Sequence, residues 1–214
     1  MSTTTTARRG YTSELRAQQA EQTRLRIVDA ALARFRVDGY EKTPLADIAA
    51  EAGVSVETVR AHGPKSALMV AAARCVAHDP DAGPLLDTEL GRAYLAQPDP
   101  ESFLDFTVGV SLELNRAAYG VYAALAGAAA GDPELDRELT ARLAALRADL
   151  DELLGIWVDR GWARTDLPRD ELLASVWIIT MPETYERLVV RAGFDEQRYL
   201  RWLRRSLAEV LLPR

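Results

Sequence analysis

The chain has 214 residues, of which 48% are hydrophobic and 27% charged, and its formal net charge is −6. This composition is typical of a folded protein and excludes a disordered acidic tail, and the length suits one large domain or two small ones. The sequence contains no run of about 18 uncharged apolar residues, so no membrane span is predicted. The single cysteine excludes an intrachain disulfide and fits a reducing, cytoplasmic compartment.

The N-terminal residues 1–20 are predicted to form a disordered arm, because they are rich in threonine at their start and no apolar segment follows. The first helix comes after this arm. Its apolar residues Leu25, Val28, Leu32 and Phe35 recur at steps of three and four, which is the spacing of one face of an amphipathic helix.

Two short helices are predicted next. Thr43 followed by Pro44 is a typical helix start, with a capping hydroxyl and then a proline in the first turn. Gly53 ends this helix. Ser55 caps the third helix, which runs to about His62.

The remaining segments predict further helices, and none shows the alternation of a strand. Residues 79–100 contain several prolines and form a connector. Apolar residues at helical spacing follow over 103–125 and 135–157. The segment 172–181 is apolar on nearly every face, so we expect that helix to be buried on all sides. A final amphipathic helix covers 200–210, and the fold class is therefore all-α.

The segment from Leu45 to Lys65 has the spacing of a helix-turn-helix, in which two helices cross with only a short turn between them. Ala49 supplies a small residue at the crossing, Gly53 tolerates positive φ in the turn, and Val59 points inward from the second helix. A helical hairpin inside an ordinary bundle would explain these three residues. It would not explain a short polar helix flanked by basic residues, which is suited to a DNA groove.

Residues 22–76 resemble the N-terminal domain of the TetR family of bacterial transcriptional regulators. The resemblance rests on TRLRIVDAALARFRVDGY, then TPLADIAAEAGVSVETV, then a helix that begins at Lys65. Towards the C-terminus, MPETYERLVVRAGF and the last helix resemble the dimerising end of many members. The sequence departs from the family at 60–64, where it lacks the common Tyr-x-His-Phe aromatics, which puts the DNA contacts of this segment in question.

The resemblance implies an N-terminal three-helix helix-turn-helix domain at 21–78 and a helical effector-binding and dimerisation domain at 79–214. It also implies a homodimeric, cytoplasmic and nucleoid-associated repressor that leaves a near-palindromic operator in double-stranded DNA when an unknown small-molecule effector binds. We expect no membrane contact, no enzymatic activity, no cofactor and no metal site. Activation remains an alternative to repression. Further alternatives are a helical structural or interaction protein with a degenerate helix-turn-helix, and a helical small-molecule carrier or enzyme.

The candidate site residues fall into three groups. Candidate DNA contacts, some of them implied by the resemblance, are Thr43, Ser55, Val56, Glu57, Thr58, Arg60, His62 and Lys65. Candidate effector contacts are the large side chains on faces predicted to be buried: Phe106, Tyr119, Tyr122, Trp157, Trp177 and Met181. Candidate dimer contacts are Trp177, Leu200, Leu203 and Leu207. Core packing is the alternative for each of the large side chains.

The net charge is unevenly distributed between the two predicted domains. Residues 1–65 hold 10 Lys and Arg against 8 Asp and Glu, whereas residues 66–214 hold 16 against 24. The acidity therefore belongs to the second domain, and it does not exclude a nucleic-acid partner for the first.

Overall fold

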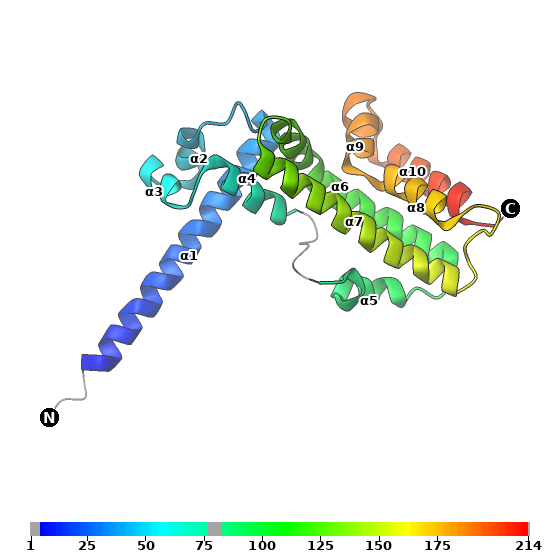
Figure 1. The fold of residues 1–214 in the computed structure, drawn as a ribbon, viewed down its shortest axis with the longest axis horizontal. Coiled ribbons are helices and arrows are strands. Elements are labelled where there is room, and N and C mark those ends of the chain that lie inside the picture. The colour runs from blue at the N-terminus through cyan, green and yellow to red at the C-terminus, as the bar shows by residue number, and fades with distance from the viewer. Residues whose placement is uncertain (1–4, 77–82, 214) are drawn as a thin grey trace. The chain divides into compact units, whose positions relative to one another are not determined.

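The computed structural model describes residues 5–76 and 83–213, with side chains from residue 18 onward, and these residues are helical with no strand. The chain divides into two compact units, Met1–Ala72 and Ala73–Arg214 (Figure 1). The all-α prediction is confirmed. The domain boundary predicted at residue 78 falls in the stretch 77–82, which is outside the described residues.

The first unit consists of four helices: α1 (Thr5–Asp38), α2 (Leu45–Ala52), α3 (Val56–Ala61) and α4 (Lys65–Arg74). Helix α2 packs against both α1 and α3. Each helix contributes apolar side chains that are completely buried, and these include Ile27, Phe35, Ile48, Val59 and Met69. A shared apolar core therefore holds the two short helices in place.

Helix α1 begins at Thr5, where the sequence predicted a disordered arm over residues 1–20. The backbone over 14–26 has no glycine or proline and consists mostly of Leu, Arg, Ala, Gln and Glu, which are strong helix formers. The helix therefore extends toward the N-terminus beyond the predicted domain start at residue 21.

The turn between α2 and α3 depends on two residues with defined backbone conformations. Gly53 is left-handed, with φ 65° and ψ 40°, and the N–H of Val54 donates to the carbonyl of Ala49 at 3.0 Å. Ser55 is extended, and its side chain accepts a hydrogen bond from the N–H of Thr58 at 3.1 Å. This is the glycine-ended helix followed by a serine-capped helix that the sequence predicts.

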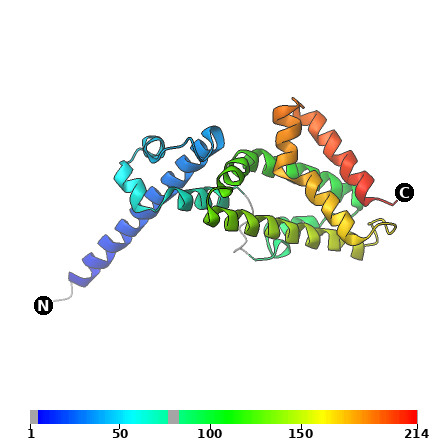
Figure 2. The ribbon, with the colours of Figure 1, turned by 45° about the horizontal axis from the view of Figure 1, so that its top comes forward.

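The second unit contains η2 (Leu85–Asp87), α5 (Glu89–Leu95), α6 (Pro100–Ala129), α7 (Pro133–Asp159), α8 (Arg169–Thr180), α9 (Pro182–Tyr185), the π-helix η3 (Glu186–Arg191) and α10 (Glu196–Leu211). The long helices α6 and α7 lie side by side, and α6 also packs against α9 and α10 (Figure 2). Both long helices begin with a capping aspartate followed by proline, Asp99 in α6 and Asp132 in α7.

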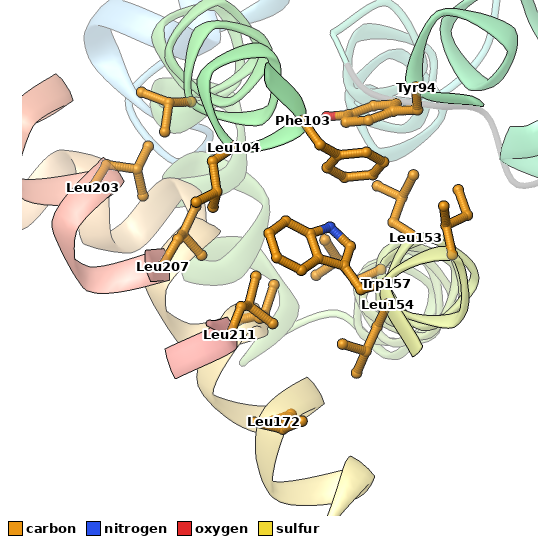
Figure 3. Packing of buried hydrophobic residues seen from close by; sticks show 14 of the residues in the cluster. Tyr94, Phe103, Leu104, Leu153, Leu154, Trp157, Leu172, Leu203, Leu207 and Leu211 are labelled. Atoms are coloured by element: carbon orange, nitrogen blue, oxygen red, sulfur yellow. The ribbon is translucent and has the colours of Figure 1, made fainter. Parts of the chain in front are cut away.

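The core of the second unit is built around Trp157, which is 2% exposed. Its ring meets Phe103 edge-on, with centroids 5.5 Å apart and planes at 85°. Leu207 and Leu211 of α10 lie in the same cluster (Figure 3). The inner face of the last helix is therefore occupied within its own chain.

The prediction that segment 172–181 is buried on all sides is wrong for α8 within the single chain. Leu172 and Leu173 are buried, but Ile178 is 65% exposed. The helix packs against α7, α9 and α10 on one side only. Its remaining side presents apolar surface to solvent.

Replacing Gly53 by Ala should lower the free energy of unfolding of the first unit by about 1 kcal/mol. No described atom crowds the new Cβ, so the cost comes from the left-handed backbone alone. Gly53→Asn is the matched control and should lose less, because asparagine tolerates this conformation better. Urea denaturation followed by circular dichroism measures both variants, and unchanged stability of Gly53→Ala would contradict the argument.

Candidate nucleic-acid interface and internal cavity

Helix α3 is held by one face and exposes the other. Val59 is completely buried, whereas Ser55, Glu57 and Arg60 are exposed at the surface. The helix has six residues, too few to be stable alone, so its position depends on the packing of Val59. The exposed face combines a hydroxyl, a carboxylate and a guanidinium, groups that can reach base edges and phosphates.

Two of the predicted DNA-contact residues are hydrogen-bonded to each other. The hydroxyls of Ser55 and Thr58 lie 3.0 Å apart, in addition to the cap that Ser55 provides for the N–H of Thr58. Val56 beside them is half-buried. These residues therefore fix the start of α3, while Glu57 and Arg60 supply its exposed charges.

The predicted role of Thr43 as helix cap and phosphate contact is wrong for its side chain. Thr43 is completely buried, and its hydroxyl donates to the carbonyl of Gly39 at 2.7 Å. The residue before α2 is Pro44, which makes no side-chain cap. Thr43 instead closes the loop that begins at the left-handed Gly39, so its hydroxyl is not available to DNA.

Lys65 and His62 lie where the third and fourth helices meet. The ammonium of Lys65 donates to the carbonyl of Tyr40 at 2.8 Å and lies 4.2 Å from the centroid of its ring. An ammonium has three donors and Lys65 is half-exposed, so a phosphate contact remains open to it. His62 ends α3 and is half-buried.

Residues 60–64, where the sequence departs from the family, form the link between α3 and α4. Gly63 has a φ of 123°, a conformation that favours glycine, and leads through Pro64 into α4. This link leaves Arg60 exposed on the last turn of α3. The chain thus presents a guanidinium on the last turn of this helix.

A cavity of about 380 Å³ lies inside the second unit, between α5, α6, α7 and the junction of α8 with α9. Its lining is mainly apolar and includes Leu85, Leu90, Val110, Leu114, Leu146, Leu150 and Leu153. Polar and charged side chains also line it, as in cavities that bind small molecules. They include Thr88, Glu89, Thr107, Ser111, Asn115, Tyr122, Arg142, Asp149 and Thr180.

Tyr122 alone, among the six predicted effector contacts, lines this cavity. Phe106 packs edge-on against Tyr94, Tyr119 packs against Tyr185, and Trp157 lies in the core. Trp177 and Met181 do not line the cavity, although their chain neighbours Thr180 and Pro182 do. Most of the large aromatic side chains therefore serve core packing, the alternative left open by the sequence.

The sequence reasoning missed the polar residues of the cavity. Asn115 is 4% exposed, and its amide donates to the carbonyl of Thr180 at 3.0 Å and to the hydroxyl of Tyr199 at 3.3 Å. Arg142 is 2% exposed, and its Nε donates to Glu138 at 2.7 Å. The sequence did contain a sign that Arg142 is buried, because this residue lies in the apolar stripe of α7 between Leu139 and Leu146.

Two of the four predicted dimer contacts are wrong, because these residues are buried within the single chain. Leu203 and Leu207 are completely buried in the single chain and offer no surface to a partner. Trp177 and Leu200 are half-buried. The large exposed apolar side chains of this region are Ile178 on α8 and Val190 on the π-helix.

Burial shifts the titration of the tyrosines around the cavity. It raises the pKa of Tyr94 to about 12, partly offset by a hydrogen bond with Thr107. It also raises the pKa of Tyr122, against the opposing charge of Arg142. These phenols therefore stay protonated and remain hydrogen-bond donors at neutral pH.

Comparison with known proteins places the first unit. Residues 27–62 match the model of bacterial regulatory proteins of the tetR family. The match spans α2, α3 and about the last third of α1, which contain the helix-turn-helix described above. The predicted resemblance to the TetR family is thus confirmed for this part of the chain. No curated protein matches the chain.

Solved structures extend the likeness in fold to most of the chain. A candidate transcriptional regulator from Saccharomonospora viridis in complex with choline is 18% identical, with a TM-score of 0.74 over 91% of this chain and 100% of the other. FadR from Bacillus subtilis in complex with stearoyl-CoA is 13% identical, with a TM-score of 0.66 over 87% and 97%. NalD, the secondary repressor of the MexAB-OprM multidrug efflux pump in Pseudomonas aeruginosa, is 19% identical, with a TM-score of 0.62 over 90% and 98%.

Among the described residues, no group of three or more His, Cys, Asp or Glu side chains is placed to hold a metal ion. None of the described helices is long and apolar enough to cross a membrane.

Alkaline pH should destabilise this chain through its buried tyrosines. The unfolded chain releases the Tyr94 proton near pH 10 and the folded chain near pH 12, so deprotonation favours the unfolded state and the free energy of unfolding falls as the pH rises between these values. Tyr94→Phe should make this fall smaller. Urea denaturation at pH ~9 and pH ~11 measures it; an equal fall in both proteins would contradict the assignment.

Proposed function

We propose that the protein is a homodimeric repressor that binds a near-palindromic operator and leaves it when a small molecule occupies the cavity of the second unit. The observation that carries the DNA-binding part is the geometry of α3. Val59 and the cap at Ser55 hold its inner face, and the outer face presents Glu57 and Arg60 within a TetR-family domain.

DNA recognition is assigned to α3, which enters the major groove. Arg60 donates to guanine or to phosphate, and Glu57 accepts from a cytosine amino group. Lys65 and the exposed Lys42 contact phosphates on either side of the motif. Since residues 1–65 carry only a small basic excess, binding depends on where these few cations lie rather than on overall attraction.

Dimer formation is assigned to the exposed apolar residues Ile178 of α8 and Val190 of the π-helix, together with the half-buried Trp177 and Leu200. A two-fold dimer buries the same patch of both copies, and its paired recognition helices match two half-sites about one helical turn apart. This arrangement is the reason for expecting a near-palindromic operator.

Effector control is assigned to the cavity between α5, α6 and α7. A ligand lowers operator affinity only to the extent that it binds the non-DNA-binding conformation more tightly. The solved structures with choline and with stearoyl-CoA are compatible with a ligand in this helical domain, and a cytoplasmic location follows from an operator as target.

Arg60→Ala should weaken binding to operator DNA by about tenfold or more, because it removes a charged contact from α3. The operator is first obtained by selecting genomic fragments with the purified protein. Arg147→Ala, an exposed arginine of α7, is the matched control and should bind as the wild type does. Fluorescence anisotropy measures the affinities between ~50 and ~200 mM salt, where the wild type should weaken steeply. Equal affinities of the two variants would contradict the assignment to α3.

Ile178→Glu should convert the dimer into monomers, because a carboxylate would be buried in the apolar contact. Val158→Glu is the matched control, since Val158 is another exposed β-branched apolar residue, on α7, and should leave the dimer intact. Sedimentation equilibrium at micromolar concentration gives the molecular masses. If the Ile178→Glu variant stays dimeric, Ile178 does not lie in the dimer interface.

A further inference from the structure

Arg142 is a buried cation with most of its hydrogen-bonding capacity unused. Its side chain is 1% exposed, and Nε makes its ion pair with Glu138 at 2.7 Å. Both terminal nitrogens, Nη1 and Nη2, are buried and have no hydrogen-bond partner among the described residues. The same residue lines the cavity.

This arrangement requires an acceptor that the described chain does not supply. A guanidinium stays charged at every pH at which the protein is folded, and it carries five N–H donors in a planar fork. Leaving buried donors of a charged group unpaired destabilises a protein more than leaving neutral ones unpaired. Glu138 satisfies one edge of the fork, and the terminal edge stays open.

The surroundings indicate which kind of acceptor fits. Along α7 the cavity continues over Leu146, Leu150 and Leu153, and α6 adds Val110 and Leu114. The acidic residue Asp149, which also lines it, is seven residues further along α7, about 10 Å from Arg142 along the helix axis. A second acidic residue, Glu89 in the first turn of α5, also lines the cavity. The charged lining therefore consists of one cation, Arg142, and two carboxylates, and the rest is mainly apolar.

Other groups near Arg142 refine this description. Tyr122 lines the cavity and feels the charge of Arg142, and its buried phenol keeps its proton and adds a neutral donor. Glu138 is 16% exposed, so it retains some hydration, and it contacts a different edge of the guanidinium. Glu183 acts on Tyr122 but does not line the cavity.

We propose that the cavity binds a small monocarboxylate with an apolar body. The carboxylate accepts from Nη1 and Nη2 of Arg142 in the bidentate geometry that suits this pair, and the body lies along the leucines of α6 and α7. A quaternary ammonium would meet Arg142 as a like charge, so a choline-type ligand would not bind through this residue. The assignment of this carboxylate as effector rests on the proposed regulatory function, whereas the carboxylate site itself does not.

The test compares matched ligands on the full-length protein. The probes are straight-chain carboxylates from hexanoate to dodecanoate, benzoate, phenylacetate and 4-phenylbutyrate, each paired with its primary alcohol, together with choline. Isothermal titration calorimetry gives the affinities for the wild type, for Arg142→Met and for Arg142→Lys. Operator affinity is measured in parallel with and without each probe.

At least one carboxylate should bind the wild type about ten- to a hundredfold more tightly than its alcohol, the effect of charge-assisted hydrogen bonds. Arg142→Met should lose this preference while it still binds the alcohol, and Arg142→Lys should retain part of it. Any affinity for choline should not depend on Arg142 and should be retained by Arg142→Met. The site is overturned if no carboxylate is preferred by the wild type, or if Arg142→Met keeps the preference.

Two controls keep the outcomes separate. The far-UV circular dichroism spectrum and the cooperative thermal unfolding of ligand-free Arg142→Met show whether the variant folds; if it does not fold, the wild-type comparison of acid with alcohol decides alone. A carboxylate that binds through Arg142 but leaves operator affinity unchanged would support the site and overturn its role as effector. A wild type that binds no DNA would overturn the proposed function and leave the carboxylate test intact.

Discussion

A six-residue helix cannot hold its own shape in water, and the candidate DNA-reading surface lies on such a helix. Helix α3 exists because Val59 is completely buried, because the left-handed Gly53 turns the chain, and because Ser55 caps the first turn. Each contact uses an inner or terminal group of the helix. The outer face is thereby left free of structural duties, so its residues can be selected for recognition.

The second unit is likewise held together by buried side chains. Phe103 of α6 packs edge-on against Trp157 of α7, and Leu207 and Leu211 of α10 lie in the same core (Figure 3). Leu150 and Leu153 of α7 belong to this core and also line the cavity. The packing of the second unit and its candidate ligand site therefore share residues of the same helix.

Sequence patterns predicted the helices and the helix-turn-helix well, since glycine, proline and apolar spacing act locally. They failed where partners are distant in the chain. The hydroxyl of Thr43 had two uses, and only the fold shows that it closes the loop from Gly39. Leu203 and Leu207 form an apolar stripe that suits a core as well as an interface, and three-dimensional packing decides for the core.

Arg142 illustrates why a residue that breaks a pattern carries information. An apolar side chain at this place in the stripe of α7 would need no hydrogen bonds and would pack against its neighbours. A guanidinium there, with Glu138 satisfying only one edge, lowers the stability of the ligand-free chain. A ligand that supplies the missing acceptors would pair the buried N–H groups of Arg142. Binding would then remove the free-energy cost of the unpaired groups as well as form new contacts. The same property would make ligand affinity depend on an acceptor at this one position, while the leucines along the cavity tolerate variation in the apolar body.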